Sequence, residues 1–293
     1  MSFLFNRAVI AGVGLIGGSL GLAGKQRGVF KTVAGFGRNE NTLKKALELG
    51  LIDEAHTELE KACAGADLFF AATPVESIVS LCVNAGAHLP ESCVMTDGGS
   101  VKGRIVEDME RLLPNPGRFV GGHPIAGTEK SGPSAAFSTL FDNRYTILTP
   151  TQATDTRALS AAREMWEKVG SIVVEMTPEE HDAALAMISH LPHIAAFALV
   201  DALNAADPDK TIRRYVAGGF KDTTRIAASH PAMWRDIFSM NRRQVLNAVE
   251  AFEKSLGELK YMISEGRFED LERTLESISV NRKEMENSGN SAK

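Results

Sequence analysis

His123 is the residue whose chemistry depends most on its neighbours. It lies in GGHPIAGTEKSG, residues 121 to 132, between a glycine pair and Pro124 and directly after an apolar segment. An imidazole can pack in a core, bind a metal ion or accept a proton near neutral pH. The glycines leave space for a ligand and the proline fixes the backbone. This setting favours the proton acceptor.

Two further histidines, His190 and His193, stand three residues apart in SHLPH, residues 189 to 193, near a proline. Imidazoles at this spacing could bind zinc, but no cysteine or carboxylate stands at a supporting ligand spacing. We therefore predict no metal site. Both histidines are candidates for substrate binding, and we expect one to face the cleft and the other to be a hydrogen-bonded structural histidine.

A third stretch, GGFKDTTRIA at residues 218 to 227, places Lys221 and Arg225 in an expected break between helices. A guanidinium is a planar, bidentate donor that suits a carboxylate. We predict that Arg225 binds an anionic substrate group. The alternative is a surface salt bridge with Asp222 or Asp236.

A glycine motif near the start of the chain predicts where a second reactant binds. Gly12, Gly14 and Gly17 form G-x-G-x-x-G directly after the apolar run AVIA, residues 8 to 11, and open a helical pattern. In this context the glycines allow a tight turn, close approach of a pyrophosphate and helix packing. The motif predicts dinucleotide binding, with a purely structural glycine turn as the alternative.

The choice between NAD and NADP depends on the end of the second expected strand. An NAD site usually has a carboxylate there for the ribose 2′-hydroxyl, whereas this chain has Gly37, Arg38 and Asn39. A guanidinium suits a 2′-phosphate, so Arg38 favours NADP. Arg38 could equally be a solvated loop residue or stack on adenine.

The elements that must position these residues alternate between β-rich and helical runs. We expect strands at residues 8–11, 32–36, 67–73, 93–97, 118–122 and 145–149. Such alternation is typical of a doubly wound α/β domain of the Rossmann type, and we place it at residues 1–175. After SIVVEM, residues 171–176, only helical patterns follow, which predicts an all-helical substrate and dimerisation domain at residues 176–293. Its helices are apolar on more than one face, so we expect a homodimer.

Composition excludes several classes of partner. The 293 residues carry a net charge of −5, with a pI near 5.9, so no basic field attracts nucleic acid or an anionic membrane. Three cysteines without a C-x-x-C pair suit a reducing cytoplasm. The apolar start lacks a basic region and reads as a strand, not a signal peptide. No apolar run reaches the ~18 residues that span a bilayer, so no membrane segment is expected.

Several stretches together resemble one family over nearly the full length of the chain: the prephenate and arogenate dehydrogenases of tyrosine biosynthesis. They are GVGLIGGS, ATPV (72–75), DGGSVK (97–102), GGHPIAGTEKSG, WEKVGSIVVEMTPEEHD, SHLPH, GGFKDTTRIA and MWRDIF. The glycine motif is common to many dehydrogenases, whereas HPIAGTEKSG combined with SHLPH is specific.

The resemblance implies an oxidative decarboxylation and assigns roles to matching positions. His123 would accept the substrate hydroxyl proton, Ser100 would hold that hydroxyl and His123, and Arg225 would bind a carboxylate. His193 would contact the substrate side chain, and Thr128 and Glu129 would border the pocket, Glu129 as a gating residue. Two of the stretches add cofactor-binding candidates: Leu15, Ile16, Thr73 and Pro74.

Alternatives remain within and outside the family. The sequence does not separate prephenate from arogenate, and we favour prephenate. Related hydroxyacid or imine reductases need a catalytic lysine in the long helix, but HDAALAMISHLPHIAAF contains none. A non-catalytic cofactor sensor would be expected to lack His123 or Ser100. Inhibition by tyrosine, if present, would act by competition in the active site.

Overall fold

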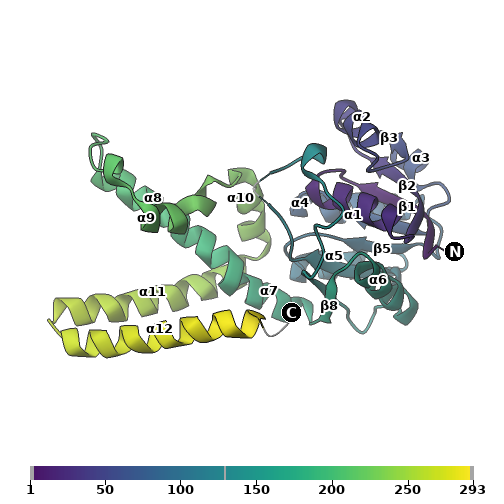
Figure 1. Cartoon of the computed structure of the whole chain (residues 1–293). Helices are drawn as coiled ribbons and strands as arrows, with labels where there is room; N and C mark the ends of the chain where they lie inside the picture. Colours follow the sequence, from purple (N-terminus) through teal and green to yellow (C-terminus); the bar gives the residue numbers. More distant parts are fainter. Residues whose placement is uncertain (1–2, 129, 291–293) are drawn as a thin grey trace. The chain divides into compact units, whose positions relative to one another are not determined.

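The computed structural model describes residues 3–128 and 130–290, with only the backbone described for residues 287–290. The chain forms two compact units, one ending at Arg242 and the other beginning at Arg243 (Figure 1). The expected functional boundary between residues 175 and 176 lies inside the first unit. That division by function stays a prediction.

The first unit is built on an eight-stranded sheet in the order β3-β2-β1-β4-β5-β6-β7-β8. Neighbouring strands are parallel except β6 and β7, which are antiparallel. The strands are β1 (Phe5–Ala11), β2 (Phe30–Phe36), β3 (Glu54–His56), β4 (Leu68–Ala71), β5 (Val94–Asp97), β6 (Phe119–Pro124), β7 (Tyr145–Thr149) and β8 (Ile172–Glu175). The doubly wound α/β fold expected from the sequence is confirmed.

Apolar side chains on both faces of β1 explain why AVIA reads as a continuous apolar run. Ala8 and Ile10 belong to one core cluster, and Val9 and Ala11 belong to the cluster on the opposite face. Successive side chains of a strand point to opposite faces, and a parallel sheet is covered by helices on both. The edge strand β3 was missed because its three residues, Glu-Ala-His, show no apolar pattern.

Helices cover both faces of this sheet. Residues of α1 and α6 enter the cluster that contains Ile10, whereas residues of α4 and α5 enter the cluster that contains Val9. The bounds are α1 (Leu15–Gln26), α2 (Glu40–Glu48), α3 (Leu59–Cys63), α4 (Val75–Gly86), α5 (Gly103–Leu112) and α6 (Thr156–Lys168).

Beyond the sheet, the first unit continues as helices. They are α7 (Pro178–Leu185), a π-helical turn (Ala186–His190), α8 (Leu191–Ala206), α9 (Gly218–Thr224) and α10 (Pro231–Met240). Thr177 and Glu180 form a capping box that begins α7. Trp234 and Ile237 of α10 join the core cluster that contains Val9, so this helix packs on the sheet domain.

Two expectations about these helices are wrong. Residues 218–227 are not a break, because α9 forms there and a 3₁₀ turn, Arg225–Ala228, follows it. The run Pro178–Ala206 is long and apolar enough, by length and composition, to cross a membrane, so the expectation that no run reaches this length is wrong, whereas the absence of a membrane segment stays a prediction. Pro192 does not end the run, because its missing N–H falls in the first turn of α8 after the π-helical turn.

The second unit is a helical hairpin of α11 (Arg242–Ser264) and α12 (Phe268–Asn290). Gly266 joins them with a φ of 66°, a conformation that favours glycine at a helix C-terminus. Many large apolar side chains of the hairpin are exposed, among them Leu246, Phe252, Leu256, Tyr261, Ile263, Leu275 and Ile278. Exposed apolar surface on this scale is typical of an interaction surface.

Candidate active site

The glycine turn after β1 has the geometry of a dinucleotide site. Gly12 has a φ of 95°, and a Cβ there would lie 2.5 Å from the carbonyl oxygen of Ala72. A Cβ on Gly17 would collide with the Gly12 carbonyl, whereas one on Gly14 would meet nothing within 4 Å. The turn therefore leaves open space at Gly14, beside the N-terminus of α1, which suits a pyrophosphate.

The strand order places this turn where a dinucleotide is expected. The chain order reverses between β1 and β4, and ligands bind at the carboxyl ends of strands at such a switch point. Thr73 and Pro74 follow β4, and Leu15 and Ile16 open α1 and are partly exposed. Arg38 is exposed in the loop after β2. The structure therefore places all the predicted cofactor residues at the carboxyl end of the sheet.

Lys102 and Asp97 form a fully buried ion pair between β5 and β6. The Lys102 ammonium also donates to the Gly122 carbonyl oxygen at 2.8 Å, and the Gly122 N–H donates to Asp97 at 3.0 Å. Burial lowers the pKa of Lys102, and the Asp97 charge opposes that effect. The pair ties the loop that contains Ser100 to the residue directly before His123. No hydrogen bond joins Ser100 to His123 in the described part of the chain.

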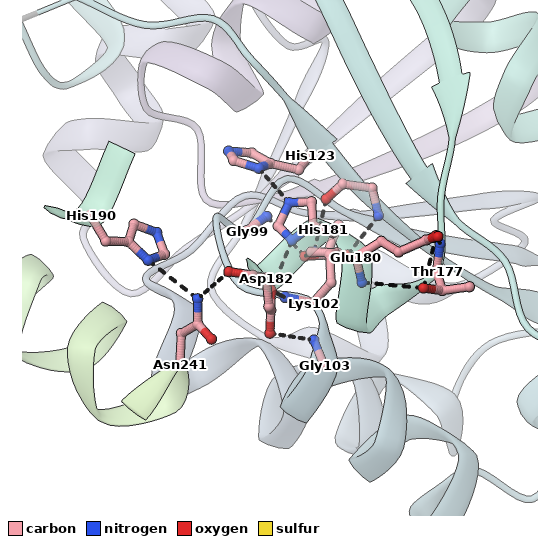
Figure 2. Close-up of polar contacts among 12 residues, drawn as sticks. Gly99, Lys102, Gly103, His123, Thr177, Glu180, His181, Asp182, His190 and Asn241 are labelled. Carbon is pink, nitrogen blue, oxygen red and sulfur yellow. Dashed lines mark hydrogen bonds and ion pairs between the residues drawn. The ribbon is translucent and has the colours of Figure 1, made fainter. Parts of the chain in front are cut away.

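His123 is connected to α7 through its ring. Its Nδ1 atom lies 2.8 Å from His181 Nε2, and His181 Nδ1 lies 2.8 Å from the Asp182 carboxylate (Figure 2). Asp182 also accepts the backbone N–H groups of Lys102 and Gly103, at 2.7 and 2.8 Å. We call Asp97, Lys102, His123, His181 and Asp182 the buried network.

Burial favours the neutral form of both imidazole rings in this network. Burial lowers the pKa of His123 well below its ordinary value, and the neighbouring His181 and Lys102 add to the effect. Burial also lowers the pKa of His181, although the hydrogen bond to Asp182 raises it. A neutral imidazole is the form that can accept a proton.

His190 and His193 have different environments. His190 is 1% exposed and its Nδ1 atom lies 3.3 Å from the amide nitrogen of Asn241, which also donates to the Asp182 carbonyl. His193 stacks on Trp234, with ring centroids 3.7 Å apart, and its Nδ1 donates to the Ser189 carbonyl at 2.9 Å. His193 lines a pocket, whereas direct substrate binding by His190 stays a prediction.

That pocket has a volume of about 900 Å³ and brings together three predicted substrate residues. Thr128, His193 and Arg225 all line it, and Glu129, the predicted gating residue, lies outside the described residues. Lys130 and His230 line it as well, and the sequence reasoning gave them no role. We call this cavity the pocket. Its residues include two permanent cations, which suits an anionic ligand.

The sequence reasoning also missed Lys102, His181 and Asp182. All three lie inside motifs that it quoted, DGGSVK and WEKVGSIVVEMTPEEHD. These residues could have been found because they are charged or titratable groups within segments that are expected to be buried. Such groups are rarely buried without partners, so their presence there indicates a hydrogen-bonded or ion-paired cluster.

The chain matches two family models. Residues 20–175 match the model described as the prephenate dehydrogenase nucleotide-binding domain. Residues 177–277 match the model described as the prephenate dehydrogenase dimerization domain.

Individual proteins are similar over most of their length. The chain is 37% identical to a prephenate dehydrogenase of Bacillus subtilis, over 92% of this chain and 74% of that protein. It is 34% identical to a cyclohexadienyl dehydrogenase of Zymomonas mobilis, over 89% of each. The crystal structure of Aquifex aeolicus prephenate dehydrogenase in complex with hydroxyphenyl propionate and NAD+ matches with a TM-score of 0.91 and 41% identity, covering 96% of this chain and 98% of that one.

Proposed function

Because the chain belongs to the prephenate dehydrogenase family, we propose that it catalyses the oxidative decarboxylation of prephenate to 4-hydroxyphenylpyruvate with a nicotinamide cofactor. One observation carries the proposal. The carboxyl ends of the parallel strands β1, β5 and β6 bring the glycine turn, the Ser100 loop and His123 to one edge of the sheet. A hydride acceptor and a proton acceptor can therefore meet one substrate.

The residues divide the reaction between them. A nicotinamide cofactor held at the glycine turn would supply the acceptor for the hydride of the ring carbon that bears the hydroxyl group. His123 accepts the hydroxyl proton in the same oxidation, and Ser100 orients that hydroxyl group. The ring carboxylate leaves as carbon dioxide and the ring becomes aromatic, which makes the reaction effectively irreversible.

The pocket would hold the substrate by its charges. Prephenate is a dianion and the protein has a net charge of −5, so local cations must offset the repulsion. We propose that Arg225 binds a carboxylate, that His193 contacts the side chain, and that Thr128 and Glu129 border the entrance. Lys130, which lines the same cavity, adds positive charge.

Cofactor preference is a finer question. Arg38 is exposed where a 2′-phosphate would lie, which is the basis for favouring NADP. The Aquifex aeolicus structure contains NAD+ and so gives no support to that preference. The hypothesis is tested by comparing kcat/KM for the two cofactors, and a preference for NAD above tenfold would reject it.

Assembly and location complete the proposal. We propose a homodimer formed by the helical region, because residues 177–277 match a dimerization domain and only 28% of an apolar 18-residue window within Pro178–Ala206 is buried in one chain. Residues 1–175 would then bind the cofactor and residues 176–293 would complete the substrate site and the dimer. The three free, buried cysteines suit a reducing cytoplasm.

A direct assay tests the activity. Purified protein is mixed with prephenate or arogenate and with NAD+ or NADP+, and the absorbance of the reduced cofactor is followed. We expect signal with prephenate, and the His123→Asn variant is the matched control for the enzyme's own contribution. Absence of signal in all four mixtures would contradict the proposal.

A second substrate has a specific reason to be included. A relative that covers 89% of this chain is a cyclohexadienyl dehydrogenase, so arogenate is the alternative substrate. Arogenate carries an amino group where prephenate carries a keto group, and the product would be tyrosine. A higher kcat/KM for arogenate would replace the first proposal with this one.

A further inference from the structure

The hydrogen bonds around His123 have a direction that decides which of its nitrogens is free. We propose that His181 and Asp182 of α7 are positioning residues, which hold His123 in the tautomer whose Nε2 atom is unprotonated. The inference rests on the proposed function for its kinetic consequence, but not for the tautomer itself. It assigns roles to two residues outside the cofactor turn and the pocket.

The direction follows from the Asp182 end of the chain of bonds. The Asp182 carboxylate already accepts N–H groups from Lys102 and Gly103, so its oxygens act as acceptors. His181 Nδ1 must therefore donate to it, which leaves the Nε2 atom of a neutral His181 with a lone pair. That lone pair accepts a hydrogen bond from the Nδ1–H group of His123. With its proton on Nδ1, a neutral His123 has Nε2 free.

Hydrogen bonds of the Gly122 backbone oppose the alternative in which the His123 ring turns its Nδ1 atom away from His181. Gly122 is held through its carbonyl oxygen by Lys102 and through its N–H by Asp97, so the start of the His123 side chain is fixed. Figure 2 shows the His123 ring with one nitrogen toward His181 and the other directed away from it. A rotation of the ring would leave the buried His181 without its partner, which is unfavourable.

Burial and the charge of Lys102 favour the neutral form of both imidazoles, His123 and His181. Lys102, Asp97 and Asp182 are the charged groups that face the pair, and His190 lies on the far side of Asp182 through Asn241. His181 is fully buried, and burial disfavours a second positive charge beside Lys102. The alternative, a charged His181 that donates to His123 Nδ1, would put the proton of His123 on Nε2 and block the reaction.

The step that this tautomer permits is balanced. The hydroxyl O–H bond of the substrate breaks and its proton bonds to His123 Nε2. The electron pair of that bond forms a carbonyl group with the ring carbon, and the hydride of this carbon goes to the nicotinamide. His123 becomes an imidazolium whose Nδ1–H still donates to His181. When carbon dioxide leaves, the electron pair of the broken carbon–carbon bond enters the ring. The oxygen of the former hydroxyl group, now the phenol oxygen of the product, takes the proton back from His123.

The tautomer is measured directly by nitrogen NMR on protein labelled with ¹⁵N-histidine, at pH 7 and without substrate. The signal that disappears in His123→Asn identifies His123. We expect a protonated Nδ1 and an unprotonated Nε2. A protonated Nε2, or a charged ring, would overturn the proposal even in an active enzyme. If the protein proves inactive with prephenate, this result still stands or falls alone.

Kinetics with two variants of His181 then separate positioning from mere structure. His181→Gln can place an amide oxygen near the former Nε2 atom and accept the same bond, whereas His181→Leu cannot. We expect kcat to fall about 10²-fold or more in His181→Leu with KM nearly unchanged, and to fall less than about tenfold in His181→Gln. His88→Gln, at an exposed position, is the control for loss of a histidine.

The NMR signal of His123 in the His181 variants completes the test. In His181→Leu we expect the Nδ1-protonated tautomer to lose its dominance, and in His181→Gln we expect it to persist. Equal loss of kcat in both variants, with the tautomer unchanged, would mean that His181 only supports the fold. That outcome would overturn the proposal.

Discussion

The buried network and the pocket lie in the same compact unit and are built in opposite ways. In the buried network, Asp97, Lys102, His181 and Asp182 are each at least 93% buried and hydrogen-bonded. In the pocket, Thr128, Lys130 and Arg225 are exposed. In our proposal the buried network determines which nitrogen of His123 carries its proton, whereas the pocket presents positively charged side chains at the surface.

The difference follows from what each region has to do. A proton acceptor needs one geometry and one protonation state, which a desolvated, fully paired set of groups can maintain. A charged substrate has to enter and leave through water, so its partners need to be accessible. Substitutions in the buried network should therefore change kcat or stability, and substitutions in the pocket should change KM.

The sharpest test of the contrast is His123→Asn. Removal of the proton acceptor should lower kcat by about 10²–10⁴-fold, with little change in KM, because the imidazole acts mainly in the transition state. Steady-state kinetics with prephenate measure both constants. A large rise in KM with kcat preserved would place His123 with the binding residues instead.

Lys102→Met should be the largest effect on stability. The variant leaves Asp97 buried without its cation, which costs about 3–5 kcal/mol of the free energy of unfolding. Urea denaturation followed by circular dichroism measures the change. Lys130→Met, in the exposed pocket, is the matched control and should change stability by less than about 0.5 kcal/mol. Similar effects of the two variants would erase the distinction.

The buried residue His190 makes the free energy of unfolding depend on pH. Burial lowers its pKa from 6.5 to about 4. Between these values the unfolded chain binds more protons than the folded protein, so the free energy of unfolding decreases as pH falls from 6.5 to 4. The contribution of this residue amounts to about 3 kcal/mol, and it is fully present above pH 6.5.

The variant His190→Asn isolates that contribution. Its amide oxygen can still accept from Asn241, but it does not titrate. We expect the stability of the variant relative to the wild type to improve by about 3 kcal/mol between pH 7 and pH 4, measured by urea denaturation. His88→Asn, at an exposed position, should show no such difference. A constant offset at every pH would contradict the assignment.

The sheet and the glycine turn could be predicted because their signals are local. AVIA followed by Gly12-x-Gly14-x-x-Gly17 contains the strand, the turn and the helix start within ten residues. The buried network could not be predicted in the same way. His123 and His181 are 58 residues apart in sequence, and only the packing of α7 against α5 and β7 brings them together.

The helical region shows the other limit of local patterns. Gly218 and Gly219 suggested a loop, yet α9 forms, and the hydroxyl groups of Thr223 and Thr224 donate to carbonyls one turn earlier. In SHLPH, Pro192 falls in the first turn of α8, directly after a π-helical turn that the sequence pattern did not predict. Tertiary packing overrides weak helix propensities. The binding role of Arg225 was predicted from its charge, although the backbone conformation expected for this stretch was wrong.

Arg225→Ala tests the pocket, and the expected effect is the smallest of the set. Loss of a charged hydrogen-bond partner for a carboxylate should raise KM by about 10–100-fold while kcat changes little. Lys221→Ala is the matched control, since the same stretch carries this cation but it is not among the described residues that line the pocket. An unchanged KM in Arg225→Ala would mean that the carboxylate is held elsewhere. If kcat fell as it does in His123→Asn, binding and proton transfer would not be separate tasks of the two regions.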